Sequence, residues 1–175
     1  PLRNKRVVLI GTGKIGKVTC MNLISMGVKE VTLVNRNARK AEKLADRFDV
    51  NVAPFESMTA RLTDADLVIV ATGAKEPIIR PEHIKAVREA GSQQPIVMMD
   101  LSVPRNIDPH VGEMSNIRLI NMDMLNDRLD ETYKDREANI PLVEEIISEE
   151  ITEFKRWYSE QRVVPTIKAL TQKLE

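Results

Sequence analysis

Cysteine, histidine and long apolar runs are scarce in this sequence, and each shortage excludes a class of structure or function. The 175 residues include one cysteine, Cys20, which excludes an internal disulfide and fits a reducing, cytoplasmic location. The two histidines, His83 and His110, stand in different segments without nearby cysteines, so we expect capping or surface residues and no metal site. No apolar run approaches the ~20 residues of a membrane span, and we expect no membrane association.

The sequence also has no excess of positive or negative charge, and it lacks a recognisable set of catalytic acid and base residues. The chain has 26 basic and 26 acidic residues, so its net charge is zero and no broad attraction to nucleic acid is implied. No Ser-His-Asp set and no exposed cysteine beside a base can be found. Cys20 shares a helical face with Leu23 and Gly27 and is expected to be buried. We therefore predict no catalytic residue in this chain.

A glycine-rich loop between a strand and a helix is the most informative feature present. The apolar run 7–10 leads into the loop, a helical pattern follows, and a second strand comes at 31–35. The loop consists of Gly11, Thr12, Gly13, Lys14, Ile15 and Gly16. Gly11 permits a tight turn, Gly13 lets the backbone approach a pyrophosphate, and Gly16 lets the helix pack closely on the strand. In this βαβ context the motif predicts dinucleotide binding at a helix N-terminus.

The end of the second strand predicts which dinucleotide binds. A ribose 2′-hydroxyl usually meets a carboxylate there, but this chain has Asn35, Arg36 and Asn37. A guanidinium can grip a 2′-phosphate, and Asn37 is placed to cap a helix whose N-terminus, with Lys40, faces the same anion. These residues favour NADP(H) over NAD(H). The alternative is that the basic residues form only a solvated face, namely Arg36, Arg39, Lys40 and Lys43.

Alternating strands and helices predict an α/β fold with a Rossmann-type, doubly wound parallel sheet in the order 3-2-1-4-5-6, followed by a long α-helix. We expect strands at 7–10, 31–35, 50–53, 67–71, 96–100 and 117–121, and helices at 14–26, 38–48, 56–62 and 81–90. The runs are apolar without alternation, as in strands covered on both faces. Gly27, Pro81 and Gly91 stand where helices end or begin.

The segment after residue 122 has a different character, because it is charged, lacks glycine and carries an apolar stripe at helical spacing. We predict three parts: a nucleotide-binding domain at 1–122, a long helix at 123–161 and the start of a further domain at 162–175. Pro141 predicts a kink near Glu137. The helical pattern breaks before Pro165, and a further short helix is predicted at 166–170. The stripe from Leu125 to Tyr158 exceeds what a small domain can cover and predicts self-association.

Two loops at the carboxyl ends of the strands complete the expected site. Thr72 and Gly73 follow the fourth strand, where they could meet the nicotinamide ribose or form only a turn. The segment 100–109 follows the fifth strand. Its Asp100 and Arg105 are either a structural pair that stiffens the loop or cofactor contacts.

Several of these segments, in this order, resemble glutamyl-tRNA reductase. They are the loop 11–16, Val-Asn-Arg (34–36), Ala-Thr-Gly-Ala (71–74), Asp-Leu-Ser-Val-Pro-Arg-Asn-Ile-Asp-Pro (100–109), the long helix, and Val-Val-Pro-Thr-Ile-Lys-Ala-Leu (163–170). The resemblance implies NADPH-dependent reduction of glutamyl-tRNA to glutamate-1-semialdehyde in tetrapyrrole (porphyrin) biosynthesis. It also implies a homodimer and makes glutamate-1-semialdehyde aminomutase a possible partner.

The resemblance further implies a division of labour between domains. The family's nucleophilic cysteine belongs to an N-terminal domain that this sequence does not contain, and Cys20 cannot replace it from the phosphate-loop helix. We therefore expect this chain to supply the hydride, to be inactive alone, and not to bind glutamyl-tRNA by itself. Two alternatives remain: a shikimate dehydrogenase-like NADP oxidoreductase, and a non-enzymatic NADPH-binding module that dimerises through its helix.

Overall fold

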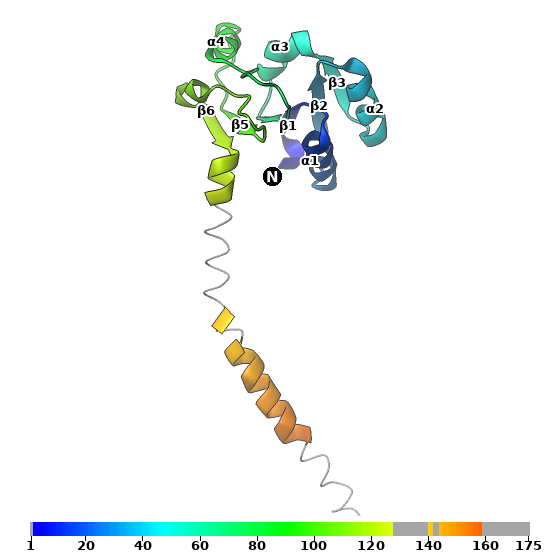
Figure 1. Cartoon of the computed structure of the whole chain (residues 1–175), viewed down its shortest axis with the longest axis vertical. Coiled ribbons are helices and arrows are strands. Elements are labelled where there is room, and N and C mark those ends of the chain that lie inside the picture. Colours follow the sequence, from blue (N-terminus) through cyan, green and yellow to red (C-terminus); the bar gives the residue numbers. More distant parts are fainter. Residues whose placement is uncertain (1, 128–139, 142–143, 159–175) are drawn as a thin grey trace, which may run out of the picture. The chain divides into compact units, whose positions relative to one another are not determined.

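Six parallel strands form the sheet in a computed structural model that describes residues 2–127, 140–141 and 144–158. The strands are β1 (Arg6–Ile10), β2 (Glu30–Asn35), β3 (Asn51–Pro54), β4 (Leu67–Val70), β5 (Ile96–Asp100) and β6 (Ile117–Asn121). Their order is β3-β2-β1-β4-β5-β6, which confirms the predicted doubly wound topology (Figure 1). In register, Val8 of β1 lies between Thr32 of β2 and Val68 of β4.

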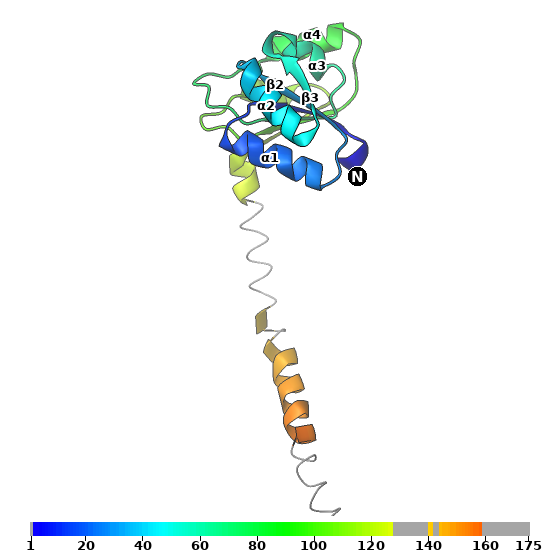
Figure 2. The ribbon, with the colours of Figure 1, turned by 90° about the vertical axis from the view of Figure 1, so that its right-hand side faces the viewer.

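Helices cover both faces of this sheet (Figures 1 and 2). On one face, α1 (Lys14–Ser25) and α2 (Ala38–Phe48) bury Cys20, Leu23 and Leu44 against Val7 and Leu9 of β1. On the other face, α3 (Met58–Leu62) and α4 (Pro81–Glu89) pack against the alternate strand residues, Val8 and Ile10 among them. Because both faces are covered, the central strands β1 and β4 are buried along nearly their whole length, as their apolar runs indicated.

The helices begin and end at the predicted capping and terminating residues. Asn37 caps α2, since its side-chain oxygen accepts a hydrogen bond from the Lys40 backbone N–H at 3.0 Å. Gly27 and Gly91 follow α1 and α4 with positive φ angles of 79° and 91°. The expected helix at 56–62 differs, because its first turn is the 3₁₀ helix η2 (Phe55–Ser57), whose Ser57 hydroxyl donates back to the Pro54 carbonyl at 2.8 Å.

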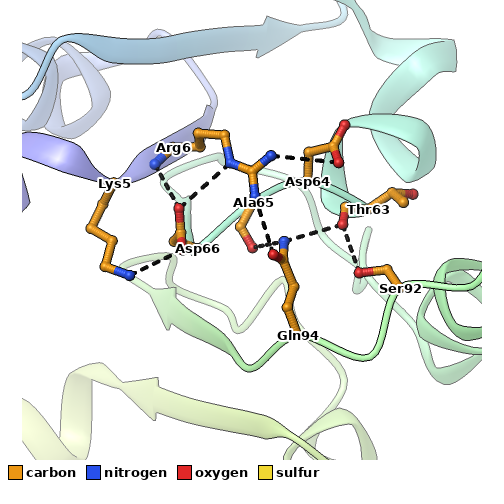
Figure 3. A network of polar contacts seen from close by, with 8 residues as sticks. All are labelled: Lys5, Arg6, Thr63, Asp64, Ala65, Asp66, Ser92 and Gln94. Carbon is orange, nitrogen blue, oxygen red and sulfur yellow. Dashed lines mark hydrogen bonds and ion pairs between the residues drawn. The ribbon is translucent and has the colours of Figure 1, made fainter.

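A polar network joins the amino-terminal ends of β1, β4 and β5 (Figure 3). Asp66 accepts hydrogen bonds from the Arg6 backbone N–H at 2.9 Å and from the Lys5 ammonium at 3.1 Å. Gln94 accepts from the Arg6 guanidinium at 3.1 Å and donates to the Thr63 carbonyl at 3.2 Å. This edge of the sheet is thus tied together by side chains, and the opposite, carboxyl edge is left for ligands.

The chain divides into two units, Pro1–Asn126 and Asp127–Glu175. After β6, residues 122–127 are helical, and the Asn121 side chain caps them by accepting a hydrogen bond from the Met124 backbone N–H at 3.0 Å. Residues 144–158 are helical and expose the large apolar side chains Ile146, Ile147, Ile151, Phe154, Trp157 and Tyr158. The predicted kink near Glu137 and the short helix at 166–170 lie outside the described residues.

Candidate functional site

The turn between β1 and α1 has the steric requirements that the glycine motif predicted. Gly11 has φ of +104°, and a Cβ there would lie 2.3 Å from the carbonyl oxygen of Ala71 in the loop after β4. A Cβ on Gly16 would lie 2.1 Å from the Gly11 carbonyl oxygen. Real Cβ atoms do not approach backbone oxygen so closely, so both positions require glycine. The predicted roles of Gly11 in the turn and Gly16 in helix packing are confirmed.

Gly13 differs from these two glycines, because a Cβ there would meet nothing within 4 Å. It is the N-cap of α1, and it offers no side chain to the first N–H groups of the helix. Those groups belong to the first turn, where Lys14 and Ile15 are exposed and Thr12 beside them is buried. Free helix N–H groups behind an open glycine form a surface that suits a phosphate anion.

Positive charge gathers where β2 ends, near that helix terminus. Asn35 donates its side-chain amide to the Asn37 carbonyl at 3.0 Å, which fixes the turn into α2. Arg36, between them, is exposed, and Lys40 lies in the first turn of α2. The first turn of α2 contains no acidic residue. A 2′-phosphate beside Arg36 would meet a guanidinium and the N-terminus of a helix whose first turn carries Lys40 and no acidic residue.

Phe55 is a residue of this region that the sequence analysis missed. The Arg36 guanidinium lies over its ring, 5.0 Å from the ring centroid. Both residues line two cavities of about 300 and 450 Å³, which also share Ala74 and Ile78. An aromatic residue directly after the third strand was the available signal, because the carboxyl ends of neighbouring strands meet at one edge. Phe55 and Arg36 together offer a flat, cationic wall to an aromatic ring.

The loop after β4 lines the smaller cavity with Thr72 and Gly73. A Cβ on Gly73 would meet nothing within 4 Å, so this side of the loop is open. The Thr72 hydroxyl contacts the side-chain oxygen of Asn106, and it accepts from the Ala74 backbone N–H at 3.2 Å. These bonds use the hydroxyl to fix the loop, and its contact with a ribose stays a prediction.

Asn106 and Asp100 hold the two carboxyl-end loops together. Asn106 is fully buried, and its amide donates to the Ala74 carbonyl at 2.8 Å. Asp100 is also buried and accepts backbone N–H bonds from Ser102 at 3.0 Å, Asn106 at 2.7 Å and Ile107 at 2.8 Å. Asn106 was missed, because a single asparagine in a loop carries no pattern in sequence.

The proposed pairing of Asp100 with Arg105 is corrected by these contacts. Arg105 forms its ion pair with Asp123, at the start of the helix after β6. Asp100 is engaged by the three backbone N–H groups of its own loop. The two side chains thus do not pair with each other, and a contact of either with the cofactor stays a prediction. The physical reason is burial, because a carboxylate inside the loop is satisfied more completely by converging N–H groups than by one exposed guanidinium.

The remaining titratable groups add no catalytic set among the described residues. Cys20 is buried, and burial raises the pKa of its thiol. His83 accepts a hydrogen bond from the Arg80 backbone N–H at 3.1 Å and caps α4. His110 contacts Asp108 at 2.8 Å at the surface, and this contact raises the pKa of the imidazole.

No group of three metal-ligating side chains occurs in the described part of the chain. Nor does any described helix have the length and apolarity needed to span a membrane.

Two family models match different parts of the chain. Residues 1–127 match the family described as shikimate / quinate 5-dehydrogenase. Residues 142–175 match the dimerisation domain of glutamyl-tRNAGlu reductase. The first match covers the nucleotide-binding fold, and the second covers the segment beyond it.

Similar proteins were found among both sequences and solved structures. Glutamyl-tRNA reductase of Christiangramia forsetii is 40% identical over 172 residues, which are 98% of this chain and 40% of that protein. The Natranaerobius thermophilus protein of the same name is 36% identical, over 99% of this chain and 38% of its own length. The structure of glutamyl-tRNA reductase from Methanopyrus kandleri aligns with a TM-score of 0.77 and 28% identity, covering 86% of this chain and 38% of that one. The chain thus spans about two fifths of the length of the curated relatives it matches.

Proposed function

The chain belongs to the glutamyl-tRNA reductase family, and on this basis we propose that it is the part of the enzyme that binds NADPH and supplies the hydride. The proposed reaction of the whole enzyme is the reduction of glutamyl-tRNA to glutamate-1-semialdehyde in tetrapyrrole biosynthesis. The observation that carries the proposal is the phosphate loop, in which Gly13 is open while Gly11 and Gly16 are sterically required.

The residues of the loop fit the pyrophosphate of a dinucleotide. The α1 N-terminus offers backbone N–H groups at a position that no side chain caps. Thr12, Gly13 and Lys14 line the open side of the turn. A helix N-terminus favours an anion through its N–H groups and its dipole, and a lysine adds a full charge. We therefore assign Gly11 to Gly16 as the pyrophosphate site, with Ile15 contributing its backbone.

The adenosine end is assigned to the cavities beside β2. The adenine ring would lie against Phe55 in the 450 Å³ cavity, which Thr72 and Gly73 do not line, and the guanidinium of Arg36 would reach the 2′-phosphate. Asn35 and Asn37 shape this turn, and Lys40 contributes a second charge. A charge-assisted contact discriminates strongly, because NADH lacks the phosphate that would satisfy the cation. NADP(H) is thus the proposed cofactor.

The nicotinamide end is assigned to the loop after β4, where Thr72 and Gly73 leave an open side. When bound, NADPH would supply the hydride that reduces an acyl group. The protein's contribution is to hold that end in place, since Thr72 is fixed by Asn106 and Asn106 by the Asp100 loop. The acyl group is proposed to be presented by another domain of the enzyme, because Cys20 is buried and its pKa is raised.

A second candidate is a shikimate dehydrogenase-like NADP oxidoreductase, which the match of residues 1–127 favours. That match concerns the nucleotide-binding fold, which both candidates share. The match of residues 142–175 to the reductase's dimerisation domain supports the first candidate. A non-enzymatic NADPH-binding module is the third. It differs from the two oxidoreductases because the full protein would bind NADPH without transferring a hydride to any substrate.

Homodimerisation is part of the proposal. The helix at 144–158 exposes Ile147, Ile151, Phe154 and Tyr158, which recur at helical spacing. Each large apolar side chain left in water forgoes ~1.5–3 kcal/mol of burial, so a second copy of the helix is a favourable cover. Because the proposed product is glutamate-1-semialdehyde, its aminomutase is a proposed partner of the whole enzyme. The proposed location is the cytoplasm.

Substitution at the open glycine tests the cofactor site. Gly13→Val should leave the fold intact, because its Cβ would meet nothing within 4 Å, yet the side chain would fill the phosphate path. We expect NADPH affinity to fall at least tenfold in titration calorimetry while the unfolding midpoint stays unchanged. Asn22→Val, exposed on the same helix, is the matched control. Equal NADPH affinity in Gly13→Val and wild type would contradict the assignment.

A further inference from the structure

Helices α1 and α2 lie side by side (Figure 2). Residues of both line a groove of about 440 Å³, and its charged lining residues are all basic. It starts at the phosphate loop, with Thr12 and Gly13, and continues along both helices. Its apolar lining includes Val18 and Met21, which are 53% and 48% exposed. Its charged residues are Lys14, Lys17, Lys40, Lys43 and Arg47.

The charges are segregated in a chain whose net charge is zero. Helix α1 has no acidic residue, and the acidic residues of α2, Glu42 and Asp46, do not line the groove. None of the four lysines forms an ion pair with a described residue, while Arg47 lies over the Phe48 ring at 5.4 Å. Cations gathered around a groove repel one another, and a bound anion would relieve that repulsion.

The cofactor accounts for only the first part of this row of charges. Lys14 and Lys40 lie at the helix N-termini, next to the proposed pyrophosphate and 2′-phosphate. Lys43 and Arg47 lie further along α2, with Arg47 roughly 10 Å beyond Lys40 at ~1.5 Å per helical residue. Lys17 is one turn along α1. A ligand that neutralises these three cations must carry anionic groups in a row.

We propose that the α1–α2 groove binds the sugar-phosphate backbone of the tRNA substrate, with Lys17, Lys43 and Arg47 contacting successive phosphates. This inference rests on the proposed function, which makes a tRNA the substrate. A groove suits a polynucleotide strand, and its exposed apolar residues Val18 and Met21 offer contacts to riboses and bases. This inference departs from the expectation, drawn from the family resemblance, that the chain does not bind glutamyl-tRNA by itself. Zero net charge implied no broad attraction to nucleic acid, but basic residues concentrated along one groove can attract it locally.

Fluorescence anisotropy with labelled, uncharged tRNA tests the inference on this chain. Lys17→Glu/Lys43→Glu should weaken tRNA binding at least tenfold, because two attractive contacts become repulsive. The control is Arg61→Glu/Lys85→Glu, which makes the same change of net charge on α3 and α4 at the other face of the sheet. Three phosphate contacts predict that the wild-type affinity falls roughly 20- to 40-fold between 50 and 200 mM salt. The groove variant should lose most of that dependence.

Three results would overturn the inference: undetectable tRNA binding by wild type, equal weakening by the control, or binding only to phosphatidylserine vesicles. NADPH titration of the same proteins separates this failure from that of the proposed function. The groove variant keeps Lys14, Arg36 and Lys40, so its NADPH affinity should stay within about twofold of wild type. Loss of tRNA binding with NADPH binding retained supports the groove. Absence of NADPH binding in wild type would contradict the proposed function itself.

Discussion

Replacing Asp100 with alanine should cost more stability than any exposed carboxylate in the domain. The side chain is 2% exposed and accepts three backbone N–H bonds, two of them from Asn106 and Ile107, which are buried as well. Each buried N–H left without a partner costs ~1–3 kcal/mol. Because the three bonds share one carboxylate and are not additive, we expect a loss of roughly 3–5 kcal/mol in the free energy of unfolding.

Urea unfolding followed by circular dichroism measures this loss. Asp100→Asn keeps one of the two acceptor oxygens and should therefore lose less stability than Asp100→Ala. The expected loss is about 1–2 kcal/mol, because the NH₂ group that replaces the other oxygen cannot accept a hydrogen bond from the backbone N–H facing it. Asp64→Ala removes an exposed carboxylate, whose 3.5 Å ion pair with Arg6 is worth at most ~1 kcal/mol. The expected order of destabilisation is therefore Asp100→Ala, Asp100→Asn and Asp64→Ala. A loss below about 1 kcal/mol for Asp100→Ala would refute the view that this carboxylate organises the loop.

Three other outcomes are expected. The Arg6 backbone N–H, and next the Lys5 ammonium, lower the pKa of Asp66. Its stabilising contribution is therefore present above the ordinary pKa of about 3.9 and lost as the pH falls through the lower folded value. Asp66→Asn should flatten the acid limb of a stability–pH curve, and an unchanged limb would contradict this. The chain alone should form no semialdehyde from glutamyl-tRNA and NADPH, and a product that disappears in Cys20→Ser would refute the division of labour. Light scattering should report dimers that Phe154→Glu weakens; a constant monomer mass at high micromolar concentration would refute pairing through this helix.

Local signals in the sequence were sufficient for the architecture and for part of the site. The apolar runs predicted every strand to within one residue, because parallel strands covered on both faces are mostly apolar, with few polar interruptions such as Asn51 in β3 and Arg118 in β6. The roles of Gly11 and Gly16 followed from the spacing of the motif. Asn37 was predicted as a cap because capping depends on residues three positions apart.

Contacts between distant segments could not be predicted in this way. Asn106 joins the loop after β4 to the loop after β5, more than thirty residues away, and no periodicity marks such a residue. Phe55 meets Arg36 only because β2 and β3 end side by side. The clustering of basic residues along the α1–α2 groove could not be predicted for a related reason. Lys17 and Lys43 belong to separate helices, and only the packing of these helices brings the two side chains to one surface.

Discrimination between NADPH and NADH is the measurement that tests the account most directly. Calorimetric titration of wild type, Arg36→Ala and the exposed control Lys85→Ala gives six dissociation constants. One charge-assisted contact contributes about 1.5–3 kcal/mol, so wild type and the control should prefer NADPH roughly ten- to a hundredfold. Arg36→Ala should lose most of that preference through weaker NADPH binding. Equal affinity of wild type for the two cofactors, or a preference that survives Arg36→Ala, would contradict the proposed 2′-phosphate site.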